Sequence, residues 1–242
     1  MRDLRTETTK PSDAEPMAKA DGVAAVDRAF AILSTLAERD EPIPLADIAR
    51  ATGFHKSTIL RLLTSLELAG YAIRLPGGQY GLGGSALRLG TAYERQNPLR
   101  QHIPPILQSL VDQDTESASF HVLHGADTRI CLFRVDSNHA TLDRINAGSI
   151  LPLDRGAAGR VIRSYSRAGF EPIPIALSRG ERDPNCAGLA AAVFGPGGFV
   201  GTISLSGPNE RFTIEAVRRM ETLLLEAVAR ATSALGGVPT PV

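Results

Sequence analysis

Cysteine is nearly absent from the sequence, with two among 242 residues. Cys131 and Cys186 are too few for a zinc site or a disulfide framework, so we expect both to be small buried side chains. No apolar run is long enough to span a membrane, tryptophan is missing, and the N-terminus carries no signal-peptide pattern. These absences argue against a membrane protein or membrane partner, and a reducing cytoplasm is the expected location.

An excess of one charge is also lacking, because 26 Lys and Arg balance 26 Asp and Glu. The distribution is nevertheless uneven: residues 50–100 hold seven cations against two anions. The cations are Arg50, Lys56, Arg61, Arg74, Arg88, Arg95 and Arg100, and the anions are Glu67 and Glu94. A locally basic segment on a neutral chain indicates a surface for nucleic acid that is confined to one part of the protein.

The most informative pattern lies in residues 54–66. The apolar residues follow the i, i+3, i+4, i+7 spacing of one helix face: Ile59, Leu62, Leu63 and Leu66. The other face carries short polar side chains around one long cation: Ser57, Thr58, Arg61, Thr64 and Ser65. Such a face suits close approach to a grooved polar polymer, although an ordinary amphipathic core helix has the same periodicity.

The flanking segments favour the first interpretation. Residues 43–52 predict a shorter helix with Pro44 near its first turn and Gly53 just past its end. Two short helices joined by a glycine-containing turn form a helix-turn-helix, whose second helix enters the DNA major groove. Apolar residues then alternate over 71–75 and 80–82 around the turn at 76–78, which predicts a two-stranded hairpin. The sequence therefore predicts a winged helix-turn-helix.

The remaining N-terminal segments complete this domain. Residues 1–20 lack periodicity and are expected to form a disordered tail. A first helix is predicted from residue 26, with an inward stripe of Val26, Ala29, Phe30, Leu33, Leu36 and Ala37. Residues 85–96 predict a connecting helix that ends near Asn97, because proline disfavours helix at the residue before it.

The second half predicts an α+β domain with an antiparallel sheet. Its expected elements are a helix within 98–113, a hairpin with strands 117–124 and 127–135, a strand at 141–145, and a second hairpin with strands 189–194 and 199–204. Thr213 is expected to cap a last helix whose inward face carries Ile214, Val217, Met220, Leu224 and Val228.

A loop rich in glycine and alanine, residues 148–159, leads into a further helix. Free backbone N–H groups at a helix start favour an anion such as a small carboxylate. Ser204 and Ser206 lie two apart on one strand and therefore share a face. The alternative is that the loop is only a tight connection and that the serines fill ordinary sheet positions.

These linked motifs together resemble the IclR family of transcriptional regulators, over about residues 21–236. The N-terminal likeness lies in Leu45-Ala46-Asp47-Ile48-Ala49, in residues 53–63, in Gly70-Tyr71 and in Tyr80-Gly81-Leu82-Gly83; the C-terminal likeness lies in residues 148–153, Ala157-Ala158-Gly159-Arg160, Glu181, residues 189–194 and residues 203–208. The resemblance implies a tail at 1–20, a winged helix-turn-helix at 21–83, a linker helix at 84–97, a GAF-like effector and oligomerisation domain at 98–236, and a tail at 237–242.

The expected DNA-binding residues lie on the second helix of the motif and on the wing. The helix beginning near His55 should enter the major groove, and the contacts are expected from His55, Lys56, Ser57, Thr58, Arg61, Arg74 and Gln79. Two-fold assembly as a homodimer or a dimer of dimers implies a pseudo-palindromic double-stranded operator.

The resemblance also implies a ligand pocket between the 148–159 loop and the second hairpin, with a small organic acid as effector. Its implied lining residues are Ala157, Ala158, Gly188, Ser204 and Ser206. One feature departs from the family: only 20 residues separate Arg160 from Glu181, where relatives carry a longer segment with additional helices. We therefore expect a reduced or reorganised pocket wall, with an effector that is unusual, bound more openly or absent.

Catalysis is the competing class of function, and the sequence gives it little support. His121 and His124 point to opposite faces of a regular strand and make a poor metal pair. No phosphate loop or nucleophile elbow occurs, and only a dyad of Cys186 with a histidine remains open. We predict no enzyme and no cofactor, but a DNA-binding regulator, expected to be a repressor. The alternative is a sensor or enzyme that uses its helix-turn-helix for protein contacts.

Overall fold

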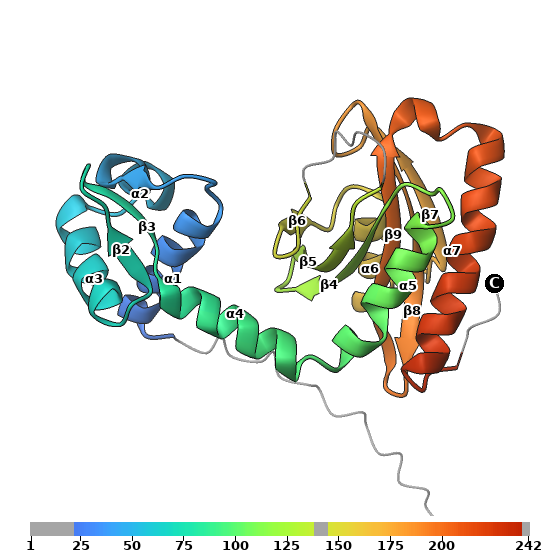
Figure 1. Ribbon diagram of the computed structural model, residues 1–242, viewed down its shortest axis with the longest axis horizontal. Coiled ribbons are helices and arrows are strands. Elements are labelled where there is room, and N and C mark those ends of the chain that lie inside the picture. The colour runs from blue at the N-terminus through green and yellow to red at the C-terminus, as the bar shows by residue number, and fades with distance from the viewer. Residues whose placement is uncertain (1–21, 138–144, 239–242) are drawn as a thin grey trace, which may run out of the picture. The chain divides into compact units, whose positions relative to one another are not determined.

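The computed structural model describes residues 22–137 and 145–238, and the chain divides into two compact units, Met1–Tyr93 and Glu94–Val242 (Figure 1). The expected tail at 1–20, most of the expected strand at 141–145 and the end of the expected tail at 237–242 lie outside the described residues. Within the described ranges, no helix has both the length and the apolar character that crossing a bilayer requires.

The first unit contains three helices and a small antiparallel sheet of order β1-β3-β2, followed by α4. Its elements are α1 (Ala24–Ala37), β1 (Ile43–Pro44), α2 (Leu45–Thr52), α3 (Lys56–Leu68), β2 (Ala72–Arg74), β3 (Gln79–Leu82) and α4 (Gly84–Gln96), of which α4 runs past the unit boundary. Gly53 ends α2 in the left-handed conformation, with φ of 70°, and its N–H donates to Ala49 O at 2.9 Å. The predicted winged helix-turn-helix is confirmed.

The core of the first unit uses only part of the inward stripe that was predicted for α1. Ile32 and Leu36 are buried, together with Ile48, Ile59, Leu63, Leu66, Ala72 and Tyr80. Ala29 and Leu33 pack against this cluster as expected, whereas Val26 and Phe30 are 48% and 62% exposed and Ala37 is exposed too. The prediction was wrong at these three positions because apolar residues surround most of α1, so their spacing does not single out one face.

The wing also differs in detail from the sequence prediction. Ile43 and Pro44 form a third strand that pairs with Tyr80 and Gln79 of β3, so the helix predicted over 43–52 begins only at Leu45. Proline is tolerated there because β1 lies at the edge of the sheet.

The second unit is built around a six-stranded antiparallel sheet of order β6-β5-β4-β9-β8-β7. Its elements are a 3₁₀ turn (Pro98–Gln101), α5 (Ile103–Val111), β4 (Ser117–His124), β5 (Thr128–Val135), β6 (Ile150–Pro152), α6 (Ala157–Ser166), β7 (Ile175–Arg179), β8 (Cys186–Gly195), β9 (Gly198–Pro208), a second 3₁₀ turn (Asn209–Arg211) and α7 (Ile214–Ala234). The α+β class and both predicted hairpins are confirmed, and the helix within 98–113 is split in two. β6 and β7 are additions that the sequence did not predict.

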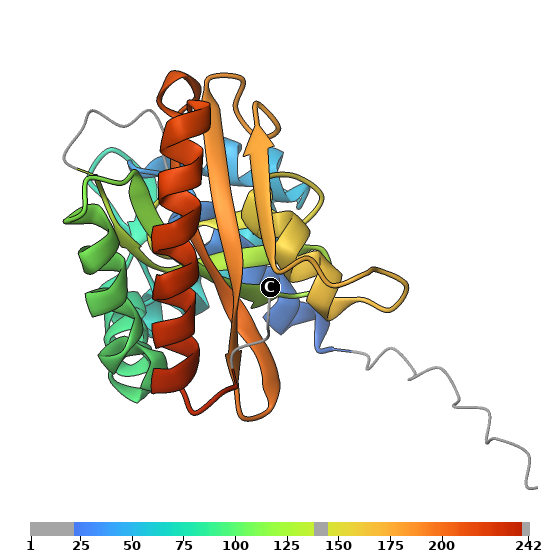
Figure 2. The ribbon, with the colours of Figure 1, turned by 90° about the vertical axis from the view of Figure 1, so that its right-hand side faces the viewer.

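Helices cover both faces of this sheet: α5 and α7 lie on one face and α6 on the other (Figures 1 and 2). The side chains of β8 alternate between the two faces of the sheet, so both faces need to be covered. Leu189, Ala191 and Val193 join the core under α5 and α7, while Ala190 and Ala192 pack against α6. The small side chains on the second face allow α6 to approach the sheet closely.

The last helix begins where the sequence predicted. The side-chain oxygen of Thr213 accepts a hydrogen bond from the N–H of Ala216 at 3.2 Å, which caps α7. Four of the five predicted inward residues are buried: Val217, Met220, Leu224 and Val228. Ile214 is 67% exposed, so its assignment to the core was wrong. Ile214 is the first residue of α7, so it lies before the first complete turn of the helix. The helical period is therefore a poor guide to which face is buried at this position.

Candidate functional site

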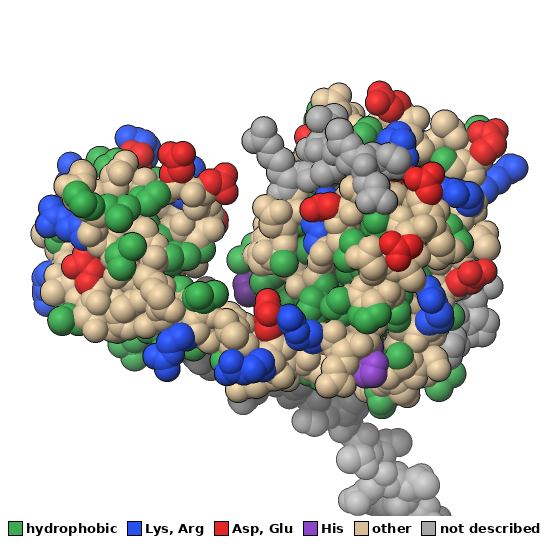
Figure 3. Space-filling view, in the orientation of Figure 1, with side chains coloured by type: hydrophobic (Ala, Val, Ile, Leu, Met, Phe, Trp, Pro, Cys, Tyr) green, Lys and Arg blue, Asp and Glu red, His purple; other side chains and the backbone are tan. Residues whose placement is uncertain are grey.

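The exposed face of α3 brings together most of the residues expected to contact DNA. His55 caps the helix with an extended backbone, and α3 begins at Lys56. His55, Lys56, Ser57 and Arg61 are exposed, and Thr58 is half-buried. Figure 3 shows Lys and Arg side chains at the edge of the first unit where α3 lies. The side chains therefore form a convex polar surface on a helix that its other face anchors in the core.

Two further residues belong to this surface and were missed from the sequence. Leu60 is 44% exposed on α3, beside the polar side chains. Arg28 of α1 lines a groove together with Thr58, Arg61 and Ser65, and its guanidinium lies 5.9 Å from the ring centroid of Phe54. An apolar residue on the polar face of α3 was visible in the sequence, whereas the position of Arg28 depends on how α1 packs against α3.

The wing presents the other two expected contacts. Arg74 ends β2 and Gln79 begins β3, so both exposed side chains flank the turn at residues 75–78. The N–H of Leu75 donates to Gln79 O at 2.9 Å and closes this turn. The Arg74 guanidinium lies 5.9 Å from the ring centroid of Tyr80. Arg74 is thus held near the tip of the hairpin.

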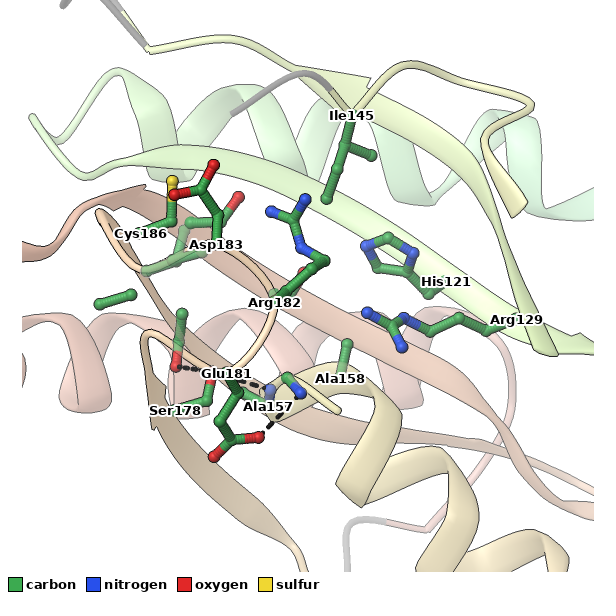
Figure 4. Close-up of a pocket in the computed structure, with 16 residues that line it drawn as sticks. His121, Arg129, Ile145, Ala157, Ala158, Ser178, Glu181, Arg182, Asp183 and Cys186 are labelled. Carbon is green, nitrogen blue, oxygen red and sulfur yellow. Dashed lines mark hydrogen bonds between the residues drawn. The ribbon is translucent and has the colours of Figure 1, made fainter. Parts of the chain in front are cut away.

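The second unit contains a cavity of about 40 Å³ between the start of α6 and strands β8 and β9 (Figure 4). All five residues expected to line an effector pocket line this cavity: Ala157, Ala158, Gly188, Ser204 and Ser206. The sequence missed several charged and polar lining residues: His121, Arg129, Ser178, Glu181, Arg182 and Asp183. They come from β4, β5, β7 and the β7–β8 connection, and their meeting depends on a strand order that the sequence did not reveal.

The start of α6 differs from the expectation of free N–H groups. The N–H of Gly156 donates to Glu181 Oε2 at 2.8 Å, and the N–H of Ala157 donates to Ser178 Oγ at 2.9 Å (Figure 4). Glu181 Oε1 also lies 3.5 Å from Arg160 Nη1. The expectation was wrong for these two N–H groups, because the protein supplies its own carboxylate and hydroxyl there.

The short segment between Arg160 and Glu181 explains this arrangement. After α6 ends at Ser166, the chain returns as the edge strand β7, which pairs with β8. β7 carries Ser178, and Glu181 follows two residues after its end. A strand thus builds the pocket wall at this point.

The loop before α6 is held by a buried arginine. Arg129 of β5 is 2% exposed, and its guanidinium donates to Pro152 O and, at 3.3 Å, to Arg155 O. A Cβ at Gly159 would lie 2.6 Å from Arg129 Nη1 and 2.8 Å from Leu153 O, so only glycine fits at this close approach. The glycine-rich loop therefore folds tightly around the guanidinium that lines the cavity.

His121 lies 1% exposed on β4, next to a β-bulge at Phe120, whereas His124 of the same strand is exposed. Burial lowers the pKa of the His121 imidazole well below its usual 6.5, and the cations Arg129, Arg134 and Arg182 lower it further. The ring is therefore neutral at pH 7. Its Nδ1 is buried and has no hydrogen-bond partner among the described residues.

The two cysteines are buried and unbridged, as expected. Cys131 lies on β5 and Cys186 lines the cavity at the start of β8.

Comparison with known proteins finds similarity to IclR regulators. Residues 25–76 match the model of the IclR helix-turn-helix domain. The chain is 25% identical to the Transcriptional repressor IclR of Escherichia coli (strain K12), over 89% of this chain and 91% of that protein.

Solved structures share the fold over nearly the whole chain. A putative IclR transcriptional regulator from Silicibacter sp. TM1040 gives a TM-score of 0.75 at 23% identity, covering 90% of this chain and 98% of that one. An IclR homolog complexed with 4-hydroxybenzoate from Microbacterium hydrocarbonoxydans gives 0.70 at 18% identity, covering 88% and 99%. Residues 25–76 thus carry an IclR helix-turn-helix domain, and over nearly its whole length the chain resembles transcriptional regulators of the IclR family.

Proposed function

We propose that the protein is a sequence-specific repressor that binds double-stranded DNA through α3 and is controlled by a small organic acid. The exposed polar face of α3 is the observation that carries the DNA-binding half. It follows a tight turn at Gly53, and its other face is anchored by Ile59, Leu63 and Leu66. A helix fixed in this way can enter a major groove without losing core contacts. Repression is supported by the likeness to a transcriptional repressor.

The contacts divide by side-chain chemistry. Arg61 is the long cation near the middle of the exposed face, where bidentate hydrogen bonds to a guanine edge are possible. His55, Lys56 and Ser57 at the helix start can donate hydrogen bonds to phosphate oxygens. Thr58 can contact a base or a phosphate. Arg74 and Gln79 on the wing suit the DNA backbone or the minor groove. We add Leu60 as an apolar contact for a thymine methyl group.

The division of the chain serves this function. We assign residues 21–83 to DNA binding, 84–97 to a linker and 98–236 to effector binding and oligomerisation. Val26 and Phe30 of α1, with Val23 just before the helix, form an exposed apolar stripe spaced by three and four residues. Such a stripe supports contact with a second copy of the chain. A two-fold dimer would recognise a pseudo-palindromic operator.

The effector half of the proposal rests on the cavity beside α6. The five expected lining residues meet there, next to the cations Arg129 and Arg182. A related structure is of a homolog complexed with 4-hydroxybenzoate, an organic acid. An anion that binds this cavity is proposed to change the affinity of the dimer for its operator, which makes the two sites thermodynamically coupled.

Selection from a library of random duplexes tests the DNA-binding half directly. Full-length protein should enrich a pseudo-palindromic sequence whose half-sites are spaced by helical turns. Binding of the enriched duplex should weaken steeply as salt is raised, because phosphate contacts release counterions. Recovery of no common sequence, with no duplex retained at low salt, would contradict the proposal.

A further inference from the structure

A buried histidine without a hydrogen-bond partner marks one side of the cavity. His121 lines the cavity, is 1% exposed, and has no partner for its Nδ1 among the described residues. A buried polar atom that lacks a hydrogen bond costs about 1–3 kcal/mol, so native proteins rarely leave one unmatched. The position of this nitrogen at the cavity indicates that a bound molecule supplies the partner.

Thr202, the cross-strand neighbour of His121 on β9, carries a second such atom. Its Oγ1 is also buried and lacks a partner among the described residues. Thr202 lies two residues before Ser204 on the same strand, so it faces the same layer as the cavity-lining serine. The unmatched polar atoms are therefore grouped on one face of the sheet.

The charge around His121 favours an anion. Arg129 and Arg134 from β5 and Arg182 from the β7–β8 connection all act on its imidazole. In Figure 4 the ring lies beside the side chains of Arg129 and Arg182. Among the described residues two carboxylates also line the cavity, Glu181 and Asp183, and Glu181 is engaged by Gly156 and Arg160.

The size of the cavity limits the anion. A water molecule needs about 10–15 Å³ of such volume, so the 40 Å³ present holds on the order of three to four non-hydrogen atoms. A two- or three-carbon carboxylate such as acetate, glycolate or lactate has four to six non-hydrogen atoms, so modest side-chain movements make room for it. 4-Hydroxybenzoate has ten, so this aromatic acid would require the wall to open.

We propose that His121 Nδ1 hydrogen-bonds to a two- or three-carbon carboxylate that Arg182 holds in this cavity. The inference rests on the proposed effector function and names the size class and the recognising nitrogen. His121 is thus a specificity-determining residue, because it offers a neutral hydrogen-bonding group amid cations. A ligand with an oxygen at this point satisfies the buried atom, and one without it does not.

Calorimetric titration of the full chain with glycolate, lactate and 4-hydroxybenzoate tests the inference. Glycolate or lactate should bind more tightly than 4-hydroxybenzoate. His121→Leu should weaken that binding about tenfold or more, because it removes a buried hydrogen bond. His121→Asn, whose amide occupies nearly the position of Nδ1, should restore most of the affinity, whereas His121→Gln should not. The matched control His124→Leu changes an exposed histidine of the same strand and should have no effect.

Proton NMR supplies a readout that a purely structural role would not change. The chain has five histidines, and the imidazole signal missing from His121→Asn identifies His121. Glycolate should shift this signal and raise the pKa of the ring, because a neighbouring carboxylate stabilises the protonated form. Folding of each variant is checked by its thermal unfolding without ligand.

Equal affinity of wild type and His121→Leu would overturn the inference, as would binding of 4-hydroxybenzoate alone or of none of the three acids. Operator binding separates this failure from failure of the proposed function. If glycolate binds through His121 but leaves duplex affinity unchanged, the inference stands and effector control fails. If duplex binding responds to 4-hydroxybenzoate alone, effector control stands and the inference fails.

Discussion

Glu181 and Gly156 meet at the start of α6, where Glu181 Oε2 accepts the backbone N–H of Gly156 at 2.8 Å. The residues are 25 positions apart, and the pair joins the end of the β7 segment to the loop before the helix. A carboxylate at a helix start is favoured by the unsatisfied N–H groups and the helix dipole. The protein thereby occupies with its own side chain part of the position that a bound anion would take.

Replacing this carboxylate should loosen the pocket wall. Glu181→Ala removes a helix-capping hydrogen bond and the ion pair with Arg160, so the free energy of unfolding should fall by about 1 kcal/mol. Urea denaturation measures the change. Glu171→Ala is the matched control, because Glu171 is an exposed glutamate in the connection between α6 and β7. Equal stabilities of the two variants would show that the cap contributes nothing.

The close approach at Gly159 gives a second prediction. Gly159→Ala places a methyl group 2.8 Å from Leu153 O, a backbone atom that must shift, so the free energy of unfolding should fall by about 1–3 kcal/mol. Gly90→Ala is a helical control with open space around its Cβ, and it should be neutral or stabilising by up to about 1 kcal/mol. Thermal unfolding of both variants checks this contrast; a neutral Gly159→Ala would contradict the tight packing around Arg129.

The buried His121 should make stability depend on pH. Its pKa is lowered in the folded protein relative to 6.5, so the unfolded chain binds the proton more readily. The free energy of unfolding should therefore decrease as pH falls from 7.5 through 6.5 toward the folded pKa. In urea denaturation, His121→Asn should flatten this decrease and His124→Asn should retain it. An unchanged slope in His121→Asn would assign the pH dependence to other groups.

The exposed stripe on α1 predicts where two copies meet. Phe30→Glu introduces a charge into an apolar contact, so dimers should dissociate at lower dilution than in the wild type. Light scattering across a dilution series measures the assembly. Leu68→Glu, at an 86% exposed apolar position at the end of α3, is the control and should leave the assembly state unchanged. If Phe30→Glu assembles like the wild type, α1 does not form the dimer contact.

Local sequence patterns were sufficient to predict the elements whose structure depends mainly on residues close together in the sequence. The spacing of Ile59, Leu63 and Leu66, the glycine at 53 and the turn at 76–78 are local signals, and α3 and the wing follow them. Likewise, Thr213 caps α7 as predicted.

The remaining features depend on partners distant in the sequence. β1 has two residues and β6 three, too short for a period, and each forms only because a neighbouring strand pairs with it. The buried face of α1 was predicted correctly at Ala29, Leu33 and Leu36 only, because apolar residues occur on several faces of this helix. The loop and the two serines that line the cavity could be predicted from the sequence. His121 and Arg129 line it only because the strands pair in the order β5-β4-β9-β8, which the sequence does not show.

The most direct test of the central claim is the affinity of Arg61→Ala for the selected operator and for a scrambled duplex, measured by fluorescence anisotropy. If Arg61 binds a guanine edge, the variant should lose about 1–3 kcal/mol on the operator, roughly 5- to 160-fold, and much less on the scrambled duplex. Arg218→Ala, an exposed arginine on α7 in the second unit, should match the wild type on both. Equal losses on both duplexes would reduce Arg61 to a phosphate contact. Wild-type affinity of Arg61→Ala for the operator would contradict the account that α3 reads DNA.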